Sequence, residues 1–151
     1  MTHRIRPARP EEAAALRTLV RAAYARWVPL ISREPAPMTD DYAARIAAGQ
    51  AFVLEAVDGR MLGAVVLEDK PDALLLDNIA IDPEMQGQRL GRILMDFVEA
   101  EARRRGYRLI RLYTNAAMEA NLRLYEHLGF VETHRVMEGA FRRVYMEKRL
   151  A

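Results

Sequence analysis

The residues with the clearest capacity for chemistry lie where an apolar run meets a glycine-containing turn. Residues 79–81 lead into Asp82-Pro-Glu-Met-Gln-Gly-Gln-Arg-Leu-Gly91. From Leu90 onward, apolar residues recur at helical spacing through Ile93, Leu94, Phe97 and Val98, which predicts a helix that begins close to the glycines. The first N–H groups of such a helix have no intrahelical acceptor and lie at the positive end of its dipole. The turn therefore predicts an anion site, most simply one for phosphate.

Two familiar phosphate-binding motifs fit this turn poorly. A dinucleotide fingerprint needs Gly-x-Gly-x-x-Gly close after the first strand of a βαβ unit. Here Gly87 and Gly91 lie in mid-chain, with Arg89 between them. A P-loop needs Gly-Lys-Ser or Gly-Lys-Thr, which the sequence lacks. An ordinary glycine turn before a packing helix is the remaining alternative for this segment taken alone.

Length and composition predict a single globular domain over residues 1–151. Of the 151 residues, 51% are hydrophobic and 29% are charged, as in soluble folded proteins. The net charge of +2 does not call for nucleic acid, so we expect no such partner. The absence of cysteine excludes disulfides and thiolate chemistry, and three scattered histidines favour no metal site. With no signal peptide and no membrane-spanning run, we expect a cytoplasmic protein without a membrane partner.

The elements that must position the turn alternate between strands and helices. A short strand around Ile5 precedes a helix that starts at Pro10-Glu11-Glu12, followed by a loop over residues 28–38. Asp40 or Thr39 is expected to cap a second, short helix that ends near Gly49. The further strands are expected at 51–57, 61–67, 74–81, 108–114, 130–137 and 143–148, and the further helices at 90–105 and 118–128. Asp58-Gly59 predicts a hairpin between the first two of these strands. An α+β domain follows.

A second motif, Asn121-Leu-Arg-Leu-Tyr-Glu-His-Leu-Gly-Phe130, follows one strand and one helix after the turn. Together the two motifs resemble the GNAT family of acetyl-CoA-dependent N-acetyltransferases, and the resemblance covers nearly the whole chain. The family pattern Arg/Gln-x-x-Gly-x-Gly/Ala is met at Gln86 and Gly91, with Arg89 where a middle glycine is common. Position 89 is therefore expected to adopt a conformation open to a residue with a Cβ.

The resemblance implies a mixed central β-sheet flanked by helices. In it, the parallel strands 74–81 and 108–114 splay apart to form the cofactor cleft. It also implies acetyl-CoA as acyl donor and direct transfer to an amine in a ternary complex. The Ile79 amide would face the developing oxyanion, and the helix dipole would assist the pyrophosphate. The implied cofactor-binding residues are Ile79, Ala80, Ile81, Gln86, Gly87, Gln88, Arg89, Leu90, Gly91, Arg92, Asn121 and Tyr125.

The resemblance places Tyr125 as the general acid that protonates the departing thiolate. Core packing is the alternative, because Met118, Leu122 and Tyr125 share a helical stripe. The candidates for activating the amine are Asp77 and Asn78, which face opposite sides of their strand. The alternative for Asp77 is a structural carboxylate that pairs with an arginine. A further alternative is that no dedicated base exists and that the amine loses its proton to solvent.

The acceptor pocket is expected to form from the first helices and their loop. Its predicted members are Tyr24, Trp27, Met38 and Tyr42, although Tyr24 and Trp27 also continue the core stripe of the first helix. The acceptor is predicted to be the primary amine of a small molecule. A peptide or protein amine, and a non-catalytic acyl-CoA-binding module, are the alternatives. The alternating strand 143–148 is expected at a sheet edge, where family members often pair, so we expect a homodimer.

Overall fold

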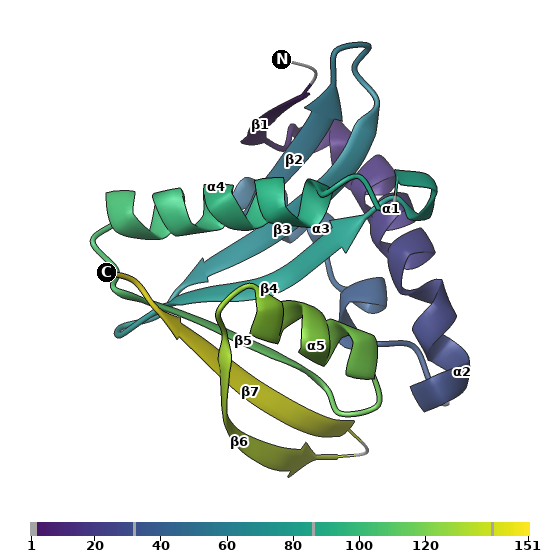
Figure 1. The fold of residues 1–151 in the computed structure, drawn as a ribbon. Coiled ribbons are helices and arrows are strands. Elements are labelled where there is room, and N and C mark those ends of the chain that lie inside the picture. Colours follow the sequence, from purple (N-terminus) through teal and green to yellow (C-terminus); the bar gives the residue numbers. More distant parts are fainter. Residues whose placement is uncertain (1–2, 32, 86, 140) are drawn as a thin grey trace. The chain divides into compact units, whose positions relative to one another are not determined.

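The computed structural model describes residues 3–31, 33–85, 87–139 and 141–151 (Figure 1). The strands are β1 (His3–Pro7), β2 (Ala51–Ala56), β3 (Met61–Asp69), β4 (Leu74–Ile81), β5 (Leu109–Asn115), β6 (Val131–Glu138) and β7 (Phe141–Arg149). The α-helices are α1 (Ala13–Tyr24), α2 (Val28–Ile31), α3 (Tyr42–Ala47), α4 (Leu90–Arg104) and α5 (Glu119–His127). The predicted alternation of strands and helices is thereby confirmed, and β4 has the bounds that were expected.

In the described residues, seven strands form one mixed sheet in the order β1-β2-β3-β4-β5-β7-β6. The α+β prediction is confirmed. The chain divides into two compact units, which we describe separately: Met1–Leu67 with Asn78–Phe97, and Glu68–Asp77 with Val98–Ala151. The expectation of a single domain over 1–151 stays a prediction.

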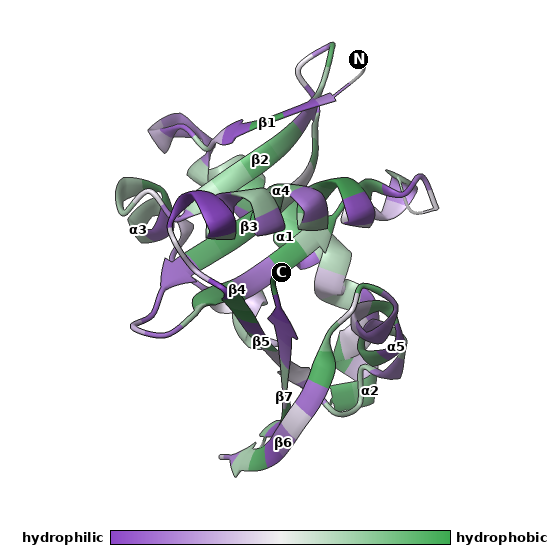
Figure 2. Ribbon diagram, turned by 60° about the vertical axis from the view of Figure 1, so that its left-hand side comes forward, coloured by the Kyte–Doolittle hydropathy of each residue, from purple (hydrophilic) through white to green (hydrophobic). Residues whose placement is uncertain are grey.

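The first unit packs α1 and α3 with the β1-β2-β3 part of the sheet. The β2–β3 pair is the predicted hairpin and is antiparallel, with Val53 opposite Ala64. Both strands are apolar along most of their length (Figure 2) and supply buried residues to the core. Gly63 allows a close approach here: a Cβ at this position would lie 3.0 Å from the Ala80 carbonyl oxygen and 3.1 Å from Leu94 Cδ1. Glycine is therefore required for β3 to pack against β4 and the first turns of α4.

An ionic network closes the outer side of the first unit. Arg6 Nη2 on β1 lies 2.8 Å from Glu12 Oε2 and 2.9 Å from Glu55 Oε2 on β2. The hydrogen bond from Arg6 holds the pKa of Glu12 at about 2. Arg6, and then Arg4, hold the pKa of Glu55 at about 2 as well. Both carboxylates are therefore ionised across the physiological pH range.

In the second unit, β7 lies between β5 and β6, and both pairs are antiparallel. The prediction that strand 143–148 forms a sheet edge is wrong. β6 is the outer strand, as Figure 1 shows, and all of its residues are exposed. The alternation of apolar and charged residues in β7 arises because one face of an interior strand is buried, with Val144 and Met146 almost inaccessible.

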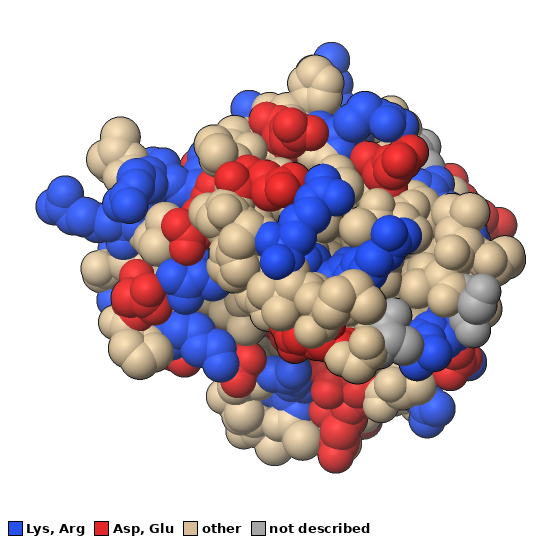
Figure 3. Space-filling view, turned by 90° about the horizontal axis from the view of Figure 1, so that it is seen from below, with Lys and Arg blue, Asp and Glu red and all other residues tan. Residues whose placement is uncertain are grey.

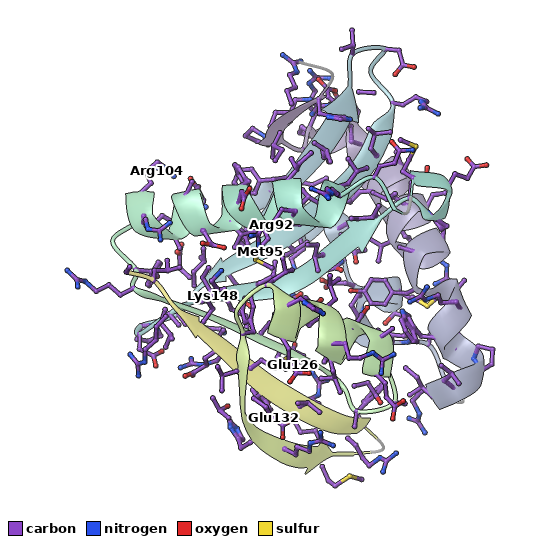
Figure 4. The ribbon with its side chains drawn as sticks, in the orientation of Figure 1. Arg92, Met95, Arg104, Glu126, Glu132 and Lys148 are labelled. Carbon is purple, nitrogen blue, oxygen red and sulfur yellow. The ribbon has the colours of Figure 1, made fainter. Side chains whose placement is uncertain are left out.

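Lys148 on β7 connects this sheet to the two helices of the second unit. Its Nζ lies 2.8 Å from Glu99 Oε2 on α4 and donates to the Leu128 carbonyl at 2.6 Å, at the end of α5 (Figure 4). A cation at this point satisfies a terminal helix carbonyl and complements the dipole of α5.

Parallel pairing of β4 with β5 joins Leu74 to Ile110 and Leu75 to Arg111.

Two local expectations needed correction. The short helix α3 is capped by Asp41, whose side chain accepts from the Ala44 N–H, rather than by Asp40 or Thr39. Asp40 instead pairs with Arg45 at 2.9 Å. The segment expected as a loop over 28–38 contains α2 and a 3-10 turn at Ala36–Thr39.

The face seen in Figure 3 carries Lys and Arg side chains interspersed with Asp and Glu.

Candidate active site

The turn between β4 and α4 presents backbone N–H groups to solvent. Gly87 has a φ of 84°, and the first intrahelical bond of α4 runs from the Ile93 N–H to the Arg89 carbonyl. The N–H groups of Leu90, Gly91 and Arg92 therefore have no acceptor four residues earlier within α4 itself. Gly87, Gln88 and Arg89 are exposed, so an anion has access to them. The predicted contact at Gln86 lies outside the described residues.

Arg89 adopts the left-handed conformation, with a φ of 60°. This conformation is accessible to a residue with a Cβ, but it costs about 1–2 kcal/mol relative to a right-handed one. It explains why glycine is common at this position in the family pattern. The side chain of Arg92 is exposed, and its Nε lies 4.0 Å from Asp96 Oδ1. Met95, three residues later and also labelled in Figure 4, is fully buried, so the boundary between the exposed and buried parts of α4 passes between these two residues.

Gly91 has no internal packing reason to be glycine. A Cβ at this position would meet only Ile81 Cδ1, at an ordinary contact distance of 3.6 Å. Gly63 differs, because a Cβ at that position would clash with neighbouring atoms of the protein itself. The bare backbone at Gly91 thus leaves space beside Ile81 at the helix start. This space and the unpaired N–H groups fit the diphosphate of a coenzyme A molecule.

The backbone of β4 exposes a second row of hydrogen-bonding groups. The Asp82 N–H donates to the Leu62 carbonyl on β3 at 2.9 Å. Because backbone groups alternate along a strand, the N–H and carbonyl groups of Ile81 and Ile79 point away from β3. Ala80 is buried between them. This edge of β4 fits the amides of an extended pantetheine arm.

Asn78 is held in a buried hydrogen-bond network within the first unit. The Tyr24 hydroxyl donates to Asn78 Oδ1 at 2.8 Å and contacts the Ile79 carbonyl oxygen at 3.2 Å. Asn78 Nδ2 donates to the Tyr42 hydroxyl at 3.0 Å, and that hydroxyl donates to the Pro37 carbonyl. The Asn78 amide is thus engaged at both ends and is only 4% exposed.

The residues predicted to line the acceptor pocket lie in the same region of the first unit. Tyr24, Trp27, Met38 and Tyr42 are each between 3% and 9% exposed. The Arg26 guanidinium lies 4.2 Å from the centre of the Trp27 ring, and Arg21 donates to the Met38 carbonyl. These four side chains therefore contribute mainly to the core, and little of their surface is accessible to an acceptor.

In the second unit, Asp77 lies next to Tyr113 of β5. The Tyr113 hydroxyl is 3.4 Å from Asp77 Oδ1, and the Arg143 guanidinium lies 4.4 Å from the centre of the Tyr113 ring. Burial, and then the charge of Asp77, raise the pKa of Tyr113. The sequence interpretation missed Tyr113 and Arg143. Each lies on a strand in which apolar and polar residues alternate, and this alternation was the one sequence signal that they share. Only the order of the strands in the sheet shows that β5 and β7 are neighbours.

Tyr125 lies on α5 and is 6% exposed. Its ring packs edge-on against Phe130, with the ring centres 6.0 Å apart. Burial alone raises the pKa of its hydroxyl, so the phenol stays protonated at neutral pH. Asn121, one turn earlier on α5, is half-buried, and its N–H donates to the Met118 carbonyl.

Neither a metal cluster nor a membrane span is found in the part of the chain that the structure describes. No group of three His, Asp or Glu side chains among residues 3–31, 33–85, 87–139 and 141–151 could hold a metal ion. Within the same ranges, none of the helices combines the length and apolarity needed to cross a bilayer.

The fold and the turn define an α+β protein with an exposed glycine turn between a sheet strand and a long helix. A model of the Acetyltransferase (GNAT) family matches residues 14–130, so the chain belongs to this family. Over 75 residues it is 37% identical to [ribosomal protein bS18]-alanine N-acetyltransferase of Escherichia coli K12. That match covers 50% of this chain and 51% of the relative, so the chain spans about half of the relative's length.

Solved structures match over almost the whole chain. The PaiA N-acetyltransferase of Thermoplasma acidophilum, solved with coenzyme A, has a TM-score of 0.84 at 19% identity and covers 99% of each chain. The ribosomal-protein-S18-alanine N-acetyltransferase of Escherichia coli has a TM-score of 0.75 at 24% identity. This match covers 99% of this chain and 94% of that protein. The GNAT fold predicted from the sequence is therefore confirmed.

Proposed function

We propose that this protein is an acetyl-CoA-dependent N-acetyltransferase that transfers its acyl group directly to a primary amine. The observation that carries the proposal is the glycine turn before α4, with N–H groups that have no intrahelical acceptor and a Gly91 that internal packing does not require. Membership of the GNAT family supports acetyl-CoA as the anion that this turn binds.

The proposed donor site consists of two backbone surfaces. The edge of β4 at Ile79, Ala80 and Ile81 holds the pantetheine arm. The N–H groups of residues 87–92 hold the diphosphate, helped by the dipole of α4 and the exposed Arg89 and Arg92 side chains. Asn121 and Tyr125 are proposed to contact the donor from α5.

The proposed chemistry is attack of a neutral amine on the thioester carbonyl. A C–N bond forms, the C–S bond breaks, and the thiolate leaves with a proton from Tyr125. Tyr125 is protonated at neutral pH, as this role requires, and because burial raises the pKa of its hydroxyl, it gives up the proton only once the negative charge on the sulfur has developed. The Ile79 N–H stabilises the oxyanion.

Asp77 is the proposed acceptor of the amine's proton, directly or through water. Its carboxylate is half-exposed and lies next to the Tyr113 hydroxyl. Asn78 has no titratable proton, and its amide is already engaged by two tyrosines, so we propose that it orients the strand rather than acts as a base.

A small-molecule amine is the acceptor class that we proposed from the sequence. The α-amine of a peptide is the second candidate, and the similarity to an enzyme named for a ribosomal protein alanine favours it. Tyr24, Trp27, Met38 and Tyr42 are proposed to support the acceptor pocket from the core side in either case, with only a small part of their surface open to the amine. We propose a cytoplasmic protein that acts without a metal, a membrane or a nucleic acid.

The test is an acetyl-CoA turnover assay with thiol detection on two matched panels. One panel holds small primary amines, and the other holds short peptides that begin with alanine, with N-terminally blocked copies as controls. Turnover with either panel supports the proposal and selects the acceptor class. Acetyl-CoA binding without turnover on any amine would instead favour a non-catalytic acyl-CoA-binding module.

A homodimer is also proposed, although not through β7, which is an interior strand. The outer strand of the second unit is β6, where Val131 and Met137 are 67% and 64% exposed. Light scattering over a range of concentrations tests this: a monomer mass at every concentration contradicts it.

A further inference from the structure

The Tyr24 hydroxyl at the end of α1 has two acceptors on β4. It lies 2.8 Å from Asn78 Oδ1 and 3.2 Å from the Ile79 carbonyl oxygen. The Asn78 side chain and the Ile79 carbonyl lie on either side of the peptide that joins Asn78 to Ile79. The N–H of that peptide is the Ile79 N–H, so the single hydrogen of the Tyr24 hydroxyl is shared between two acceptors that flank this group.

The orientation of the Asn78 amide is set from the other side by Tyr42. The Tyr42 hydroxyl gives its hydrogen to the Pro37 carbonyl and accepts from Asn78 Nδ2 at 3.0 Å. Because a hydroxyl has one hydrogen, Tyr42 faces the nitrogen of the amide and Tyr24 faces its oxygen. Tyr24, Tyr42 and Asn78 are all buried, and a buried polar network of this kind is rigid when its members are satisfied.

We infer that Tyr24 is a positioning residue for acyl transfer, acting through Asn78 and the Ile79 carbonyl to hold the Ile79 N–H in line with the thioester carbonyl. The inference rests on the proposed function, in which that N–H stabilises the oxyanion. It differs from the acceptor-binding role expected from the sequence. A positioning residue changes kcat, whereas a residue that binds the acceptor changes its KM.

Tyr24→Phe and Tyr42→Phe form a matched pair of variants. Each removes one buried hydroxyl from the same Asn78 amide, and the Tyr24 hydroxyl also contacts the Ile79 carbonyl oxygen at 3.2 Å. Removing an oxyanion donor outright lowers kcat about a hundred- to a thousandfold. Loosening its position should lower kcat less, by about five- to fiftyfold for Tyr24→Phe and by less than about threefold for Tyr42→Phe.

The experiment measures kcat, the acceptor KM, acetyl-CoA affinity and thermal stability for both variants and wild type. The expected result is a fall in kcat that is several times larger for Tyr24→Phe than for Tyr42→Phe, with acetyl-CoA affinity unchanged in both variants. A raised acceptor KM at unchanged kcat would overturn the inference in favour of acceptor binding. An equal fall of kcat in both variants would also overturn it, because the effect would then belong to the network as a whole.

A second readout does not depend on turnover. The carbonyl ¹³C and amide ¹⁵N resonances of Ile79 should shift in Tyr24→Phe and stay in place in Tyr42→Phe, with no ligand present. Unmoved resonances in Tyr24→Phe would overturn the inference even if the enzyme is active. An inactive wild type that shows the expected shifts counts against the proposed function and leaves the positioning contact supported.

Discussion

A charged side chain introduced at position 91 tests the diphosphate site directly. Gly91 lies in the first turn of α4, and a side chain there would contact Ile81 Cδ1 without a clash. Gly91→Asp and Gly91→Asn add side chains of nearly equal size that differ in charge. Both should fold, because asparagine and aspartate are better helix formers than glycine. Aspartate should gain a further ~0.3–1 kcal/mol from the helix dipole.

The expected effect on binding follows from Coulomb's law. A carboxylate about 6 Å from a diphosphate charge is repelled by ~0.7 kcal/mol in bulk water and by ~3 kcal/mol at an effective dielectric of about 20. Since 1.4 kcal/mol is about tenfold in affinity, Gly91→Asp should weaken acetyl-CoA binding by about three- to a hundredfold. Gly91→Asn should bind more tightly than Gly91→Asp by most of this factor.

Thermal unfolding with and without acetyl-CoA measures the effect. A ligand at about a hundred times its Kd adds ~2.7 kcal/mol of stability, which raises the melting temperature of a chain of this size by about 5–11 °C. A tenfold weaker Kd leaves ~1.4 kcal/mol, and a hundredfold weaker one leaves ~0.4 kcal/mol. Equal ligand-induced shifts for wild type, Gly91→Asn and Gly91→Asp would refute the assignment of the diphosphate to the start of α4.

Three further predictions concern catalysis, packing and pH. Tyr125→Phe should lower turnover by about ten- to a thousandfold with little change in acetyl-CoA affinity, as steady-state kinetics can check; unchanged turnover with chemistry rate-limiting would return Tyr125 to the core. Gly63→Ala should lower the free energy of unfolding by about 1–3 kcal/mol in urea titrations, because its Cβ would lie 3.0 Å from a carbonyl oxygen; wild-type stability would contradict the packing. Because the pKa values of Glu12 and Glu55 fall from 4.5 to about 2 on folding, their stabilisation is complete above about pH 4.5 and is lost as the pH falls toward 2. Arg6→Leu should flatten this part of a melting-temperature profile, and an unchanged slope would speak against the network.

The elements whose cause is local could be predicted from the sequence. The strand at 74–81, the Asp58-Gly59 hairpin and the helix that begins at Leu90 follow from apolar periodicity and from residues that favour turns. These signals come from residues a few positions apart, so they can be recognised in the sequence without knowledge of the fold. The glycine turn and the Tyr125 motif were recognisable for the same reason, and the family match over 14–130 agrees with them.

The tertiary structure alone decided the contacts between distant residues. Tyr24 and Asn78 are 54 residues apart, and Asn78 and Tyr42 are 36 apart, so no local pattern could pair them. The sequence suggested that the Tyr24 and Tyr42 side chains face an acceptor, whereas the structure commits their hydroxyls to Asn78. The place of β7 between β5 and β6 likewise depends on which strands pair, because an interior and an edge strand can share one alternating sequence. Periodicity specifies which face of an element is buried, but the identity of its neighbour is chosen only when the whole chain packs.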